Sequence, residues 1–185
     1  KHFVDTIQTQ KQEMMAQKLG FQKVSPSDKP IFEELEAILQ LVETDMTIFY
    51  RQLANVETLN NKQQTTDWLI FFRESFYQPD DLTNEYVTRL AAWMETYLQR
   101  LKQNDQTDEE RKQQMNKTNP KYVLRNYLSQ QAIEKAEDGD FSMIHQLQNM
   151  LLAPYDEQPE YEDFAQKRPE WARDKPGCST LSCSS

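Results

Sequence analysis

Two cysteines near the C-terminal end of the sequence have the clearest potential for reactive chemistry. Four residues separate Cys178 from Cys183 in a segment of small and polar side chains, and a loop of this length can close to disulfide distance. A thiol in an unstructured segment can also reach a partner elsewhere, because little constrains the chain there. The alternative is a pair of incidental thiols in a disordered tail, and the spacing favours neither interpretation.

Lys121 and Arg125 form a second candidate site, because they lie four residues apart near the start of a predicted helix. The N-terminus of a helix favours anions, so these two cations could contact a phosphate or a carboxylate. The alternative is ion pairing with Glu or Asp of a neighbouring helix, which is the commoner outcome for such side chains.

Most other catalytic signatures are absent from the sequence. Its three glycines are isolated, which excludes a Walker loop, a dinucleotide fingerprint and a kinase glycine-rich loop. His2 and His145 are too far apart for the usual zinc site, and we expect His145 to be a packing or surface residue. Asp156 and Glu157 could hold a divalent ion, but adjacent carboxylates in a turn are more often simply exposed. We therefore predict no catalytic residue, cofactor or metal site in this chain.

The composition excludes several classes of partner. Asp and Glu total 30 of the 185 residues against 21 Lys and Arg, which gives a net charge of −9. An acidic chain without a basic stripe is a poor candidate for binding nucleic acid or an anionic membrane. No apolar stretch is long enough to span a bilayer, and the first ten residues do not resemble a secretory signal. We expect an intracellular protein, and a chain that begins partway through a longer one.

Helical periodicity and punctuation predict an all-α fold of about eight helices. Tyr86 and Trp93 belong to an apolar stripe on the longest helix, and Thr107 with Glu110 forms a capping box. We expect Asn119-Pro120 to open a helix. The expected helices cover 3–19, 30–42, 46–53, 68–77, 82–103, 108–117, 120–137 and 141–152. The residues expected to face inward on the last two are Leu124, Tyr127, Leu128, Ala132, Phe141, Ile144, Leu147 and Leu151.

Changes in composition divide the chain into three parts. We predict a helical domain over 1–153, an ordered extended and turn segment over 154–174 that packs on it, and a flexible tail over 175–185 that carries both cysteines. Pro154 and Pro159 bracket a stiff, non-helical stretch at the start of the second part.

Several blocks resemble a known family. The block NPKYVLRNYL at 119–128, PYDEQP at 154–159, the Gly139-Asp140 turn and the closing Leu-Ser-Cys-Ser-Ser are similar to the C-terminal third of the SelO family, also called YdiU. The resemblance runs in order over essentially the whole chain. It implies that this chain is the C-terminal part of a kinase-like fold. The parent protein would transfer AMP from ATP to Ser, Thr or Tyr of protein substrates, with Mg²⁺ or Mn²⁺ as the metal ion, and would act in redox homeostasis.

The resemblance carries over one functional position. Cys183 matches the site that selenocysteine occupies in some eukaryotic members, which implies a redox role. Members with a local pair have a cysteine where this chain has Thr180, so the partner of Cys183 is either Cys178 or a cysteine of the upstream catalytic lobe. The family's nucleotide and metal residues lie in the earlier two thirds and have no match here. We expect this chain alone to be inactive and to support that lobe. The alternative is a freestanding helical protein-interaction module with no catalytic role.

Overall fold

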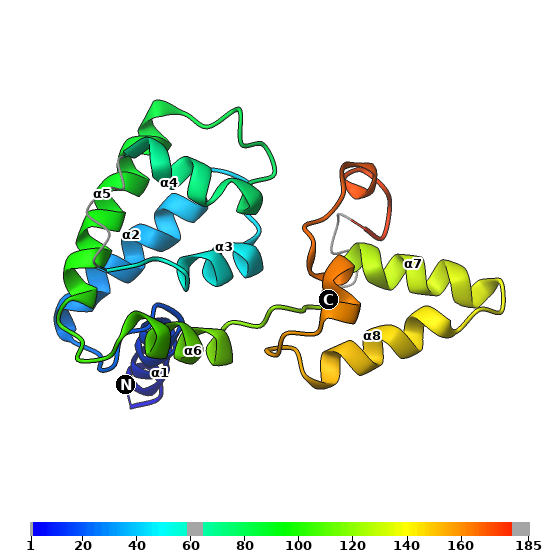
Figure 1. Ribbon diagram of the computed structural model, residues 1–185, viewed down its shortest axis with the longest axis horizontal. Coiled ribbons are helices and arrows are strands. Elements are labelled where there is room, and N and C mark those ends of the chain that lie inside the picture. The colour runs from blue at the N-terminus through cyan, green and yellow to red at the C-terminus, as the bar shows by residue number, and fades with distance from the viewer. Residues whose placement is uncertain (1, 59–64, 179–185) are drawn as a thin grey trace. The chain divides into compact units, whose positions relative to one another are not determined.

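The computed structural model describes residues 2–58 and 65–178, and helices form nearly all of their regular structure (Figure 1). The α-helices are α1 (His2–Lys18), α2 (Lys29–Leu39), α3 (Met46–Leu53), α4 (Thr65–Phe71), α5 (Asn84–Leu101), α6 (Asp108–Thr118), α7 (Asn126–Glu137) and α8 (Ser142–Leu152). Short 3-10 helices cover Pro26–Asp28, Arg73–Ser75, Pro159–Ala165 and Glu170–Ala172. Among the described residues, β pairing is limited to a single bridge between Thr44 and Phe76. The predicted all-α class is confirmed.

Side chains cap the N-termini of several helices. The Asp45 carboxylate accepts a hydrogen bond from the backbone of α3, and the Thr83 hydroxyl does the same for α5. Thr107 and Glu110 form the predicted capping box of α6. Hydrogen bonds from the Thr107 backbone and hydroxyl lower the pKa of the Glu110 carboxyl. These caps satisfy backbone N–H groups that have no partner within the helix.

The described residues up to Asn119 form one compact unit, which we call the first unit. Its core lies between α2 and α5, which run side by side (Figure 1). The predicted stripe of α5 is buried there, and it consists of Tyr86, Leu90, Trp93, Tyr97 and Leu101. Trp93 stacks on Tyr97 with a centroid separation of 5.0 Å, and its indole N–H donates to the Ile31 carbonyl at 2.8 Å.

The described residues from Pro120 onward form a second compact unit. In this second unit α7 and α8 pack as an antiparallel pair (Figure 1). Their shared core also takes residues from the segment that follows α8, and it consists of Tyr122, Tyr127, Leu128, Ala132, Met143, Leu147, Met150, Ala165, Ala172 and Cys178. The chain thus divides after Asn119, whereas the sequence places the main boundary at 153.

Two of the predicted helix boundaries differ from the structure by six residues, and the others by three or fewer. Residues 120–125 are extended and α7 begins at Asn126, so Leu124 is exposed instead of facing inward. The predicted helix over 68–77 ends at Phe71, because Phe76 leaves the helical path to pair with Thr44.

The predicted inner face of α8 is only partly correct. Leu147 is buried, but Phe141 and Ile144 are exposed. Met143 and Met150 occupy the core positions instead, on the side that faces α7.

Candidate functional site

Backbone hydrogen bonds hold the extended residues 120–125 at the start of the second unit. The backbone N–H groups of Lys121 and Tyr122 both donate to the Pro154 carbonyl, at 2.8 and 3.0 Å. The Tyr122 hydroxyl donates to the Gln158 carbonyl at 2.9 Å, and the Gln158 amide donates to the Ala153 carbonyl at 2.8 Å. Two of the sequence blocks singled out above, NPKYVLRNYL and PYDEQP, are therefore in direct contact.

Lys121 belongs to this contact and not to a helix face. Its ammonium lies 2.6 Å from a carboxylate oxygen of Glu157 and 2.6 Å from one of Glu162. Partial burial lowers the pKa of Lys121, but the hydrogen bonds to these carboxylates outweigh it, and the pKa is raised. The geometry matches the ion-pairing alternative for this residue, because two carboxylates neutralise the charge that would attract an anion.

Arg125 also differs from the predicted arrangement. It is the N-cap residue of α7, with extended backbone angles, and a guanidinium N–H of its side chain donates to the Ala165 carbonyl at 3.4 Å. The predicted helical spacing that would place Arg125 one turn from Lys121 is therefore absent, because Pro154 takes the backbone N–H groups of residues 121 and 122.

Cys178 is packed into the second unit, although the sequence predicts a flexible tail from residue 175. Its side chain joins the second core with 3% exposure, and its backbone N–H donates to the Lys175 carbonyl at 3.0 Å. Lys175 lies 2.5 Å from the Glu134 carboxylate of α7, and the hydrogen bond between them raises the pKa of Lys175 and lowers that of Glu134. A cysteine behaves as a small apolar side chain, so burial of Cys178 anchors this turn on α7. Cys183 lies outside the described residues.

The first unit contains a buried ion pair that sequence reasoning missed. The Asp28 carboxylate is inaccessible to solvent and accepts hydrogen bonds from the Arg100 guanidinium at 2.5 and 3.1 Å. The backbone N–H of Ser25 donates to the same carboxylate at 2.7 Å. Spacing could have revealed Arg100, since it follows Tyr97 by three residues and Trp93 by seven and so shares the buried face of α5.

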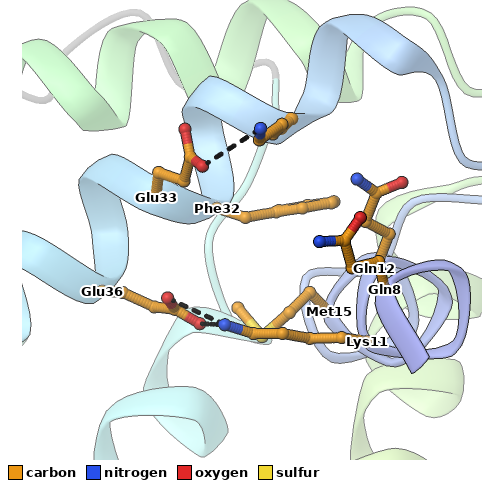
Figure 2. Close-up of a pocket in the computed structure, with 8 residues that line it drawn as sticks. Gln8, Lys11, Gln12, Met15, Phe32, Glu33 and Glu36 are labelled. Carbon is orange, nitrogen blue, oxygen red and sulfur yellow. Dashed lines mark hydrogen bonds and ion pairs between the residues drawn. The ribbon is translucent and has the colours of Figure 1, made fainter. Parts of the chain in front are cut away.

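A cavity of about 230 Å³ lies between α1 and α2 in the first unit. Figure 2 shows Phe32 at its centre, and the buried side chain of Met15 also lines it. Lys11 pairs with Glu36 at 2.8 Å on its rim. Glu33 pairs with Lys29 at 3.6 Å, so opposite charges offset each other around the opening.

The remaining predicted candidates also show no catalytic arrangement. His145 is exposed on α8, as expected for a surface residue, and Asp156 is exposed in the loop after α8. No three His, Cys, Asp or Glu side chains lie together as a metal site in the part of the chain that the structure describes. None of the described helices is long and apolar enough to cross a membrane.

The fold defines an all-α protein, and comparison with known proteins identifies its class. The family model for "Protein adenylyltransferase SelO" matches residues 1–152. A protein nucleotidyltransferase YdiU of Rhodopirellula baltica is 47% identical over 99% of this chain and 35% of its own length. Those of Flavobacterium johnsoniae and Nitrosospira multiformis are 43% and 45% identical over 99% and 93% of this chain. The chain belongs to the SelO family of protein adenylyltransferases, and it spans about a third of the length of these relatives.

Proposed function

We propose that this chain is the C-terminal helical part of a SelO-type protein adenylyltransferase, and that it supports a catalytic lobe encoded upstream. The observation that carries this proposal is the extent of the similarity, which covers 99% of this chain but only 35% of the Rhodopirellula baltica relative. The remaining two thirds are long enough to hold a kinase-like catalytic lobe.

The activity we propose for the parent protein is transfer of AMP from ATP to Ser, Thr or Tyr hydroxyls of protein substrates in the bacterial cytoplasm. The hydroxyl loses its proton to the solvent and its oxygen forms a bond to the α-phosphorus. The bond from the α-phosphorus to the oxygen that bridges to the β-phosphate breaks, and pyrophosphate leaves with the electron pair. Mg²⁺ or Mn²⁺ would offset the phosphate charge when bound.

The anion contact predicted for this chain is a poor fit for the phosphates of ATP. Lys121, the best candidate for a phosphate contact, has its ammonium between two carboxylates, Glu157 and Glu162. A phosphate placed there would meet two negative charges at close range, and their repulsion opposes binding. We therefore assign no step of the transfer to this chain and locate the nucleotide upstream.

The experiment that tests this proposal compares three proteins. They are the full-length parent, the parent from which the residues of this chain have been deleted, and this chain alone. Each is incubated with Mg²⁺ and ATP labelled at the α-phosphate, and labelled protein is counted. We expect transfer by the full-length protein, none by this chain, and loss of activity and of thermal stability on truncation. A truncated parent with full activity and unchanged stability would contradict the supporting role and favour a freestanding interaction module.

We also propose that Cys183 is the redox-active group of the chain, with Cys178 or a cysteine of the catalytic lobe as its partner. Two thiols and one peroxide molecule would give a disulfide and two water molecules. Cys178 is buried and its backbone is bonded to Lys175, so pairing with it requires this turn to open.

Mass spectrometry of tail peptides after graded peroxide treatment tests the redox role, with Cys183→Ser as the control. We expect Cys183 to oxidise under conditions that oxidise glutathione, and Cys178 to oxidise only with it or after it. A persistently reduced Cys183 would show that the tail has no redox role.

A further inference from the structure

Helix α8 differs from every other α-helix described in this chain, because it contains no charged residue. Its sequence from Ser142 to Leu152 has no Asp, Glu, Lys or Arg, whereas charged residues make up 28% of the chain. Each of α1 to α7 has at least one. Helices that are solvated on one side normally carry charges there, and helices without them are typically covered on both sides.

Among the residues that the structure describes, packing in the second unit buries one side of α8. Met143, Leu147 and Met150 form its inner face and are at most 5% exposed. The outer side carries Ile144 and Leu152, which are 41% and 79% exposed, together with uncharged polar residues such as Gln148. At 100° per residue these two positions lie about 80° apart around the helix axis.

Phe141 extends this outer apolar surface. It directly precedes α8 and is 55% exposed. Phe141, Ile144 and Leu152 define what we call the α8 face. Single exposed apolar residues are common on proteins, but three on one side of a helix without charges indicate a surface that another element covers.

We propose that the α8 face docks against the upstream catalytic part of the longer protein, an inference that rests on the function proposed above. The relatives are about three times as long as this chain, so most of their length lies outside this structure. A partner of that size could cover the α8 face without any charge to neutralise.

The size of the α8 face argues for a covalently attached partner over a second copy of the chain. Stable interfaces between separate proteins bury about 800 Å² on each partner. A helix of 11 residues is only about 16 Å long and offers three apolar side chains here. An attached partner loses little translational freedom on docking, so a patch of this size is sufficient.

Hydroxyl-radical footprinting tests the proposal directly, because the oxidation of a side chain reports its exposure to solvent. It is applied to this chain alone and to the full-length protein. In this chain Leu152 should react like Ile70 of α4, which is 70% exposed. In the full-length protein we expect its oxidation to fall roughly tenfold, toward that of Leu147, which is 5% exposed.

A matched pair of variants adds a second measurement. We expect Leu152→Glu and Ile70→Glu to leave the melting temperature of this chain unchanged. In the full-length protein only Leu152→Glu should lower the melting temperature and restore the oxidation of Phe141 and Ile144.

Three results would overturn the proposal. The first is a Leu152 that stays reactive in the full-length protein. The second is a Leu152 already protected in this chain alone, which would mean that other residues of the chain cover the α8 face. The third is protection that depends on protein concentration, which would indicate a second copy. Failure of the proposed function is seen separately, as unchanged AMP transfer and stability after truncation.

Discussion

Replacing Gly20 with alanine should destabilise the first unit strongly, for two reasons that can be separated. Gly20 ends α1 with a φ of +74°, a left-handed conformation that costs other residues about 1–2 kcal/mol. A Cβ atom there would also lie 2.6 Å from Cγ of Arg111 and 2.9 Å from the sulfur of Met115. Both neighbours are buried, and the Arg111 guanidinium is bonded to the Val56 carbonyl, so neither can withdraw freely.

The magnitude follows from these terms. Overpacking of a filled core costs about 1–3 kcal/mol. Alanine also lowers the conformational entropy of the unfolded chain, which offsets about 0.4–1 kcal/mol of this cost. We therefore expect Gly20→Ala to lower the free energy of unfolding by about 2–4 kcal/mol.

Gly139 provides the matched control, because its φ is +84° and no atom lies within 4 Å of the position of its Cβ. Gly139→Ala should cost only about 1 kcal/mol, from the backbone term alone. Since the two glycines belong to different units, hydrogen exchange of core amides in α5 and α8 measures each unit separately. Equal costs at the two sites would refute the packing argument.

Three further predictions concern the first unit. Trp93→Ala should cost about 3–5 kcal/mol in urea unfolding, as for other large core aromatics, and a loss below about 1 kcal/mol would place the indole at the surface. Asp28→Ala should lower the free energy of unfolding by about 3–5 kcal/mol, because it leaves the Arg100 charge buried and unpaired. Adding Arg100→Leu to this variant should recover part of that loss. Losses that simply add in the double variant would show that the two side chains are not energetically coupled. Burial raises the pKa of Tyr97 to about 12. This tyrosine therefore contributes to the stability of the fold below about pH 10, and its contribution is lost as the pH rises from 10 through 12. An ordinary tyrosine pKa in an ultraviolet titration would contradict this prediction.

The sequence predicts local features of this fold better than its long-range contacts. Two local predictions are confirmed, the Thr107–Glu110 capping box and the buried stripe through Trp93. Both depend only on residues that lie within eight positions of each other in the sequence. The predicted helix at Pro120 fails because a carbonyl more than thirty residues away, that of Pro154, binds the backbone N–H groups of this segment. No local pattern contains that partner.

The candidate site shows the same limit. Burial of Cys178 depends on a core formed by α7 and α8, which the composition of its own segment does not reveal. Pairing of Lys121 with Glu157 and Glu162 spans about forty residues, and the sequence offers it only as one of two alternatives. The family itself was accessible from sequence, because short blocks such as NPKYVLRNYL resemble it, and this block lies within residues 1–152, which the family model matches.

Calorimetric titration with ATP and Mg²⁺ is the most direct test of the claim that this chain supports catalysis without performing it. The same titration is made into the full-length protein and into residues 1–185 alone. We predict saturable binding by the full-length protein and none by this chain. Micromolar affinity in this chain alone would contradict the claim and show that its helices hold a nucleotide site.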